Sequence, residues 1–102
     1  MQSTGWTFRA ASAVANGTTS LTITKPSGTV DNDIMLMWLT HKGLSYATVP
    51  AGWTLVGQGI SGSTRGELYW KRASGEGANY SFTGLADTSL GYIRSYIGGL
   101  LS

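Results

Sequence analysis

The sequence predicts an all-β protein, an antiparallel β-sandwich or jelly roll of about seven strands in a single domain, residues 1–102. Segments of alternating apolar and polar residues recur at short spacing between turn residues, which is typical of a sandwich. Glycine is frequent (15 residues), and charged residues make up only 12% of the chain, about half the usual share. The length suffices for a core without metal or disulfides, and there is no cysteine.

The first third of the chain predicts two strands. Residues 6–14 alternate between apolar and polar side chains, as a half-buried strand does. The dipeptide at residues 16–17, Asn-Gly, is expected to form a tight hairpin turn. Residues 20–24 (SLTIT) then alternate with Leu21 and Ile23 facing inward.

The segment Ile34–Leu39 is apolar on both faces and follows a turn at Asp31–Asp33. Such a run is typical of a strand that lies in the middle of a sheet and is covered on each side. A two-layer sandwich, however, gives each strand one polar face. This strand is therefore expected to need a second cover, from another layer or from a neighbouring subunit.

A predicted hairpin, residues 49–73, organises the second half of the chain. A turn at residues 50–52 (Pro-Ala-Gly) precedes a strand at residues 53–58, and a second strand, rich in aromatic residues, covers residues 65–73. Four glycines lead us to expect an exposed and mobile connection between the two strands. These glycines are Gly57, Gly59, Gly62 and Gly66.

Two further strands are predicted near the C-terminus. Residues 78–83 place Tyr80 and Phe82 on one face. Residues 90–97 place Tyr92, Arg94 and Tyr96 on one face, and Ile93, Ser95 and Ile97 on the other. Residues 84–89 are expected to form a polar loop between these strands.

Four of these motifs resemble a β-sandwich module found in phage virion and tail-fibre proteins and in some bacterial surface proteins. They are PAGWTLV (50–56), YWKRAS (69–74), YSFT (80–83) and GYIRSYIGG (91–99), and with residues 22–26 they cover most of the chain. The resemblance implies a β-sandwich fold and a structural role in a virion. Members of this family usually continue with further strands after the last motif, whereas this sequence stops at Ser102, so a self-contained monomeric sandwich is not expected.

Catalysis and metal binding are not expected. The single histidine, His41, is predicted to lie exposed at a strand end, and no G-x-S-x-G nucleophile motif accompanies it. Asp31, Asn32 and Asp33 offer oxygen ligands for calcium, but the EF-hand glycine and distal glutamate are missing. These three residues are interpreted as a turn. The prediction is therefore no catalytic residue, no metal and no cofactor.

Charge and hydropathy restrict the partners. The net charge is +2, and apart from the adjacent Lys71 and Arg72 the basic residues are spread singly along the chain, which does not favour nucleic-acid binding. The N-terminus lacks the basic and apolar regions of a signal peptide, and no apolar run is long enough to span a bilayer. We therefore expect no membrane insertion, and assembly into a virion in the host cytoplasm.

Aromatic residues are the main candidates for recognition. The four tryptophans are expected mostly in the core, where each buries a large area. Tyr92, Arg94 and Tyr96 are candidates for a protein interface, because tyrosine and arginine are enriched at such sites. The apolar residues Leu100 and Leu101 are candidates for the same interface.

The sequence thus predicts a non-enzymatic virion protein, a head-decoration (cement) or fibre component. It would assemble with copies of itself, as a trimer first and a dimer second, and attach to other virion proteins. The alternative is a carbohydrate-binding adhesin module that stacks a surface glycan on Tyr46, Trp53 or Tyr92. A small hydrolase that uses His41 is a third hypothesis.

Overall fold

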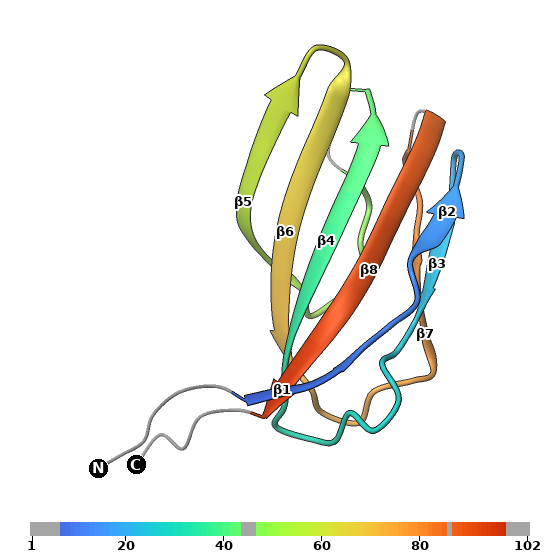
Figure 1. Cartoon of the computed structure of the whole chain (residues 1–102). Helices are drawn as coiled ribbons and strands as arrows, with labels where there is room; N and C mark the ends of the chain where they lie inside the picture. The colour runs from blue at the N-terminus through green and yellow to red at the C-terminus, as the bar shows by residue number, and fades with distance from the viewer. Residues whose placement is uncertain (1–6, 44–46, 86, 98–102) are drawn as a thin grey trace.

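The computed structural model describes residues 7–43, 47–85 and 87–97, and it contains eight strands and no helix in these ranges (Figure 1). The strands are β1 (Thr7–Ala11), β2 (Ala15–Gly17), β3 (Leu21–Thr24), β4 (Ile34–Lys42), β5 (Thr54–Ser61), β6 (Thr64–Arg72), β7 (Asn79–Phe82) and β8 (Asp87–Ile97). All pairings are antiparallel, and the two sheets pack together. The prediction of an all-β sandwich is therefore confirmed.

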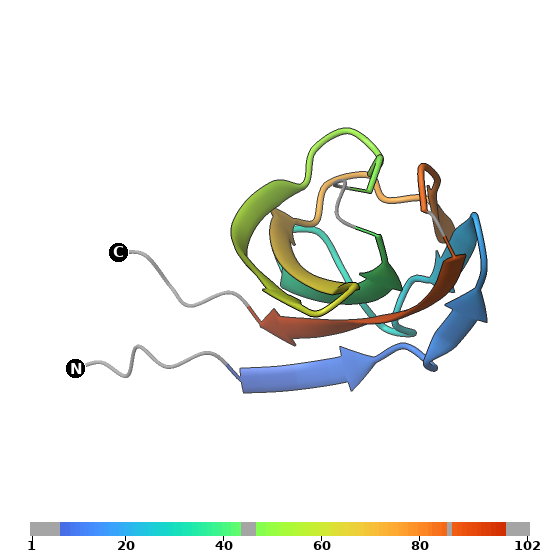
Figure 2. The same ribbon diagram turned by 90° about the horizontal axis from the view of Figure 1, so that it is seen from above.

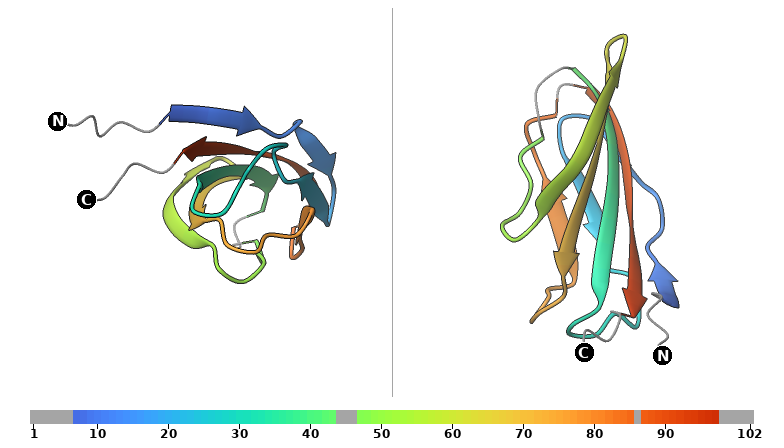
Figure 3. Two further views of the ribbon diagram at one scale, coloured as in Figure 1. Left: turned by 90° about the horizontal axis from the view of Figure 1, so that it is seen from below. Right: turned by 90° about the vertical axis from the view of Figure 1, so that its left-hand side faces the viewer.

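One sheet is large and the other small. The large sheet has the order β1-β8-β4-β6-β5, with β2 also pairing with β8, and the small sheet is the pair β3-β7. Seen from above and below, the large sheet forms a curved wall, with β3 and β7 on its inner side (Figures 2 and 3). The small sheet therefore covers one face of the large sheet, which we call the inner face.

Strand β4 lies at the centre of the large sheet. It pairs with β6 on one side and β8 on the other over its whole length. Met35, Met37 and Leu39 point to the inner face and are fully buried. The prediction of a central strand is confirmed, and the strand continues for three residues past Leu39 to Lys42.

The core lies between the two sheets. Strand β3 contributes Leu21 and Ile23, and β7 contributes Tyr80 and Phe82, as their alternation predicts. Among the tryptophans that the structure describes, Trp53 is in this core, whereas Trp38 is half-buried and Trp70 is exposed. The expectation that the tryptophans are mostly core residues is therefore wrong for Trp70.

The predicted turn at residues 16–17 is wrong. Asn16 and Gly17 lie in β2 and pair with β8, and the chain bends at residues 18–19 instead. The predicted first strand is thus two strands, β1 and β2, separated by residues 12–14. The pairing of Asn16 and Gly17 with β8 outweighs the preference of an Asn-Gly dipeptide for a turn.

The glycine-rich connection is shorter than expected. Gly57, Gly59 and Gly66 lie within β5 and β6, and a tight turn at Gly62 and Ser63 joins these strands. Gly62 has a φ of +62° and Ser63 has no positive φ, as in a type II′ hairpin turn. The predicted polar loop at residues 84–89 is also too long, because β8 already begins at Asp87.

The two sheets pack closely at Gly91, which leaves little space for a side chain. A Cβ atom at Gly91 would lie 3.0 Å from Ile23 Cδ1 in the small sheet and 3.0 Å from the Trp38 carbonyl oxygen. We expect Gly91→Val to lower the free energy of unfolding by about 1–3 kcal/mol through overpacking. Urea unfolding measures this, with Gly77→Val as the control, since its added Cβ meets nothing within 4 Å. Equal stability of the two variants would contradict this packing.

Candidate functional site

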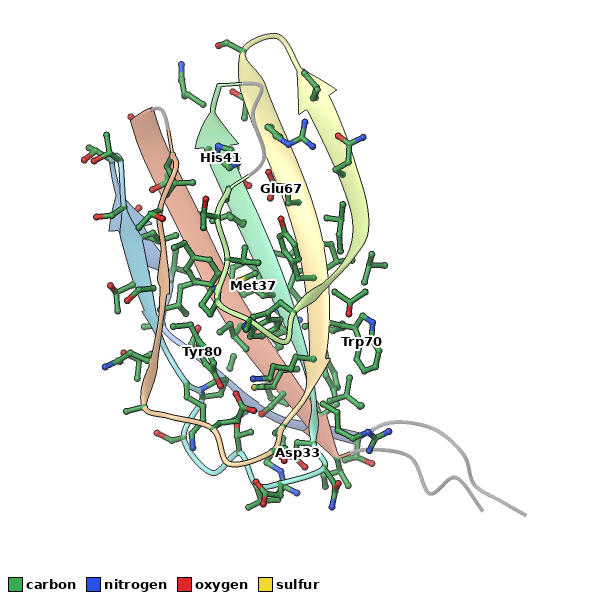
Figure 4. All side chains as sticks on the ribbon, turned by 180° about the vertical axis from the view of Figure 1, so that it is seen from behind. Asp33, Met37, His41, Glu67, Trp70 and Tyr80 are labelled. Carbon is green, nitrogen blue, oxygen red and sulfur yellow. The ribbon has the colours of Figure 1, made fainter. Side chains whose placement is uncertain are left out.

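The outer face of the large sheet is the surface that β3 and β7 do not cover. Every second residue of β4, β6 and β8 points to it, and the strand pairing arranges these side chains in rows. One row contains Trp70, Leu36 and Arg94, and the next contains Leu68, Trp38 and Tyr92. The ring of Trp70 stands away from the core, whereas Met37 and Tyr80 lie between the sheets (Figure 4).

Aromatic rings partly cover this face themselves. Trp38 and Tyr92 stack with their ring centroids 5.3 Å apart and their planes 13° apart. The Arg94 guanidinium carbon lies 5.7 Å from the centre of the Tyr92 ring, a cation–π contact. Phe8 packs edge-to-face on Tyr96 at 5.8 Å. The apolar outer side of β4 is thus sheltered by rings, but these rings are not covered by a second layer of the described chain.

The structure brings together three of the predicted interface residues. Tyr92, Arg94 and Tyr96 share the outer face of β8, and Arg94 contacts the ring of Tyr92. Leu100 and Leu101 lie outside the described residues. An interface formed by these residues stays a prediction.

The glycan-stacking residues fare differently. Tyr46 lies outside the described residues. Trp53 is buried and packs edge-to-face against Tyr80 at 5.4 Å, so the proposal that it stacks a sugar is wrong. Tyr92 already has Trp38 stacked on one side and Arg94 close to its ring. An apolar turn-flanking tryptophan is as well suited to a core as to a platform, and the sequence does not distinguish the two.

A shallow cleft opens next to Trp38. Its volume is about 300 Å³, and three glycines from β5 and β6 contribute to its lining. A Cβ atom at any of these glycines would meet nothing within 4 Å, so their missing side chains leave the space open. The lining residues are Trp38, Leu39, Thr40, Gly57, Gln58, Gly59, Gly66, Glu67 and Leu68. Gly57 and Gly59 are two residues apart, which places them on the same face of a strand. This spacing could have indicated the cleft, but the segment was interpreted as a loop.

Strand β5 forms one edge of the large sheet. It pairs with β6 on one side, and none of its side chains is buried. Leu55, Val56 and Ile60 are exposed, and the segment contains no charged residue and no proline. A register shift between Leu55 and Gly57 is the one irregularity in its pairing with β6. Natural edge strands are usually protected by charge, proline or bulges, so β5 is weakly protected beyond this shift.

A buried polar cluster lies on the inner face of the large sheet, between β4 and β6 (Figure 4). Glu67 Oε2 lies 2.8 Å from His41 Nε2 and accepts a hydrogen bond from Arg65 Nε at 2.8 Å. Tyr69 donates to Glu67 Oε1, and the Ala47 N–H donates to Oε2 at 3.4 Å. The side chain of Glu67 is fully buried.

The expectation of an exposed His41 is therefore wrong. Its position on β4 continues the alternation of the buried residues Met35, Met37 and Leu39, which turns the imidazole inward. Its Nδ1 lies 3.2 Å from the Lys42 carbonyl oxygen. Both ring nitrogens thus lie within hydrogen-bond distance of oxygen atoms, one on Lys42 and one on Glu67.

The cluster does not have the geometry of a hydrolase site. Ser89 pairs with His41 in the sheet and is buried beside it. However, the His41 nitrogens face Lys42 and Glu67, and the structure gives no hydrogen bond between Ser89 Oγ and the imidazole. The structure also buries all three side chains, those of His41, Glu67 and Ser89, away from the surface. A serine nucleophile requires a hydrogen bond to its base, and the structure shows no such bond between Ser89 and His41.

The other described carboxylates at the interior are also paired. Asp33 forms an ion pair with Arg9, and Glu76 pairs with Lys71 while accepting a hydrogen bond from Tyr80 at 2.7 Å. Burial raises the pKa of Tyr80, and the neighbouring Glu76 carboxylate raises it further. In the predicted turn, Asp31 accepts a hydrogen bond from the Gly75 N–H. Within the described ranges, no three His, Cys, Asp or Glu side chains form a cluster suited to a metal ion.

The comparisons with known proteins add no relationship. No protein family model, no curated protein and no solved structure matches the chain. None of the described segments forms a helix of the length and apolarity needed to cross a membrane.

Two carboxylates have lowered pKa values. Burial raises the pKa of Glu67, but the hydrogen bonds from Tyr69, His41 and Arg65 outweigh burial and hold the pKa below its ordinary value of 4.5. Burial likewise raises the pKa of Glu76, and the hydrogen bonds from the Ser74 N–H, Tyr80 and Lys71 bring the pKa below 4.5. Each ionised carboxylate therefore stabilises the folded state.

We expect the free energy of unfolding to decrease as the pH falls below 4.5. Unfolded Glu67 takes up a proton near pH 4.5, whereas the folded side chain does so at lower pH, so acid favours unfolding. Glu67→Gln should weaken this pH dependence and lower the stability at neutral pH by about 3 kcal/mol, because Arg65 loses its buried counter-ion.

Urea unfolding at neutral pH and in steps below pH 4.5 measures both effects. Asp31→Asn is the control, because Asp31 is exposed and accepts one backbone hydrogen bond. Part of the acid dependence should persist in Glu67→Gln through Glu76. An unchanged acid dependence in Glu67→Gln would contradict the role given to its carboxylate.

Proposed function

We propose that this chain is a non-enzymatic structural protein of a virion, a head-decoration or fibre component. It acts by assembling with copies of itself and attaching to other virion proteins. A trimer is the first expectation and a dimer the second. The observation that carries the proposal is the edge of β5, whose second side pairs with no strand of the described residues and which has exposed apolar side chains.

An open edge supports assembly by strand addition. Backbone N–H and C=O groups on the free side of β5 can pair with a strand of another chain, which extends the sheet across a subunit boundary. Between Gly57 and Ser61 the pairing of β5 with β6 is regular. The free edge of this segment can therefore serve as a regular template for pairing with another strand. Leu55, Val56 and Ile60 would lose water contact in such an interface, which favours association.

The outer face supports attachment. Tyr92 and Tyr96 are half-buried, and Arg94 between them is exposed. Buried aromatic and arginine side chains contribute much of the binding energy in protein interfaces. The low share of charged residues, 12% of the chain, also fits a protein whose surface is largely covered in a particle.

Charging the β5 edge should weaken assembly. Ile60→Lys places a cation on the free edge, where a lysine opposes pairing with another strand. We expect the oligomer to dissociate at about tenfold higher protein concentration or more, which corresponds to about 1.4 kcal/mol. Sedimentation velocity over a concentration series measures the shift.

Val30→Lys is the matched control, because Val30 and Ile60 are both 52% exposed and Val30 lies outside the strands. The control should assemble as the wild type does. If Ile60→Lys also assembles as the wild type does, or if both variants dissociate equally, the β5 edge is not the contact surface.

A further inference from the structure

The hairpin of β5 and β6 determines which backbone groups lie on the free side of β5. Ser61 and Thr64 face each other across the two-residue turn and therefore form a hydrogen-bonded pair. Hydrogen-bonded and non-hydrogen-bonded pairs alternate along an antiparallel ladder, so Gly59 also bonds to β6. Gln58 and Ile60 alternate with these residues, and their N–H and C=O groups therefore point away from β6, toward the free side of β5.

A hydrogen bond on the other side of β6 agrees with this alternation. The Gly43 N–H donates to the Ser63 carbonyl oxygen at 2.8 Å, so residue 63 bonds toward β4. Successive residues of a paired strand direct their backbone groups to opposite sides, so Thr64 bonds toward β5. Two separate contacts thus give the same assignment of the free groups on β5.

The free side of β5 is self-complementary. The regularly paired segment runs from Gly57 to Ser61, so Gly59 is its midpoint. A second copy turned end for end about Gly59 places Gln58 of one chain opposite Ile60 of the other. These two residues carry the free backbone groups, so each such pair can exchange both of its hydrogen bonds. A register centred on Gln58 would instead extend into the irregular part of the strand before Gly57.

The side chains permit this approach. Gly59 would face Gly59 of the second copy, so the residues at the centre of the contact have no side chains to clash. Gln58 and Ile60 pair with the buried Glu67 and Arg65, which places them toward the inner face. There the exposed Ile60 would pack against Gln58 of the second copy. Since β5 contains no charged residue, two copies of it meet without like-charge repulsion.

We propose that β5 pairs with β5 of a second copy of this chain, antiparallel and about a two-fold axis at Gly59. This inference rests on the proposed assembly through the β5 edge and specifies the partner strand and its register. Such a contact is isologous, because both chains contribute the same residues. At this edge it selects the dimer, the second of the two expected assemblies, and it joins the two large sheets into one continuous sheet.

Cysteine cross-linking tests the register, because the chain has no cysteine of its own. In a non-hydrogen-bonded antiparallel pair the two Cα atoms lie about 4.5 Å apart, within the range that a disulfide spans. Gly59→Cys should therefore form a disulfide-linked dimer under mild oxidation. The change should leave the fold intact, because a Cβ at this position meets nothing within 4 Å and the φ of Gly59 is not positive.

Gly57→Cys is the matched control. Gly57 lies two residues from Gly59 on the same strand face and has equally open surroundings. In the proposed register, however, the two copies of Gly57 lie about 14 Å apart, too far for a disulfide. We expect about tenfold more linked dimer from Gly59→Cys than from Gly57→Cys. A mixture of Gly57→Cys and Ser61→Cys should cross-link, because the register places these residues opposite each other.

Non-reducing gel electrophoresis measures the linked dimer, and urea unfolding with a reductant verifies that each variant is folded. Equal cross-linking of Gly59→Cys and Gly57→Cys would overturn the register, as would a mixture of Gly57→Cys and Ser61→Cys that does not cross-link. If Gly59→Cys stays unlinked although Ile60→Lys weakens assembly, β5 is the contact but pairs with another strand, such as the opposite edge β1. If Ile60→Lys also leaves assembly unchanged, the proposed assembly through β5 fails as well.

Discussion

The central strand β4 is apolar on both faces, and this constraint shapes the rest of the structure. The small sheet of β3 and β7 covers its inner side, where Met35, Met37 and Leu39 are buried. On its outer side, Trp38 is sheltered by its stack with Tyr92. A ring stack reduces the apolar area in contact with water without removing it. The outer face of the sheet is consequently suited to contact with another molecule.

The placement of charge follows from the same architecture. The interior acids that the structure describes lie against basic side chains, as in the cluster of Glu67 with Arg65 and His41. Buried ion pairs contribute little net stability but are costly to break, which makes the cluster sensitive to removal of one partner. On β4, Lys42 lies opposite Asp87 of β8, whereas Arg72 and Arg94 lie near the other end of the paired strands.

Strand periodicity predicted much of the fold and little of the candidate site. The alternation in residues 20–24, 78–83 and 90–97 identified strands and their buried faces, because burial on one face enforces a period of two. Pairing partners depend on contacts distant in sequence, so the incorporation of Asn16 and Gly17 into β2 could not be predicted locally. His41 was misplaced for a similar reason, since its buried partner Glu67 lies on another strand.

Hydrogen–deuterium exchange of the β5 amides at low and high protein concentration tests most directly whether the open edge of the sheet is completed by another copy. If it is, amides of residues 57–61 on the free side of β5 exchange rapidly in dilute protein and become protected as the concentration rises. Amides of the central strand β4 should be protected at both concentrations, because it is paired on both sides. Rapid exchange at residues 57–61 at every concentration would contradict assembly through β5.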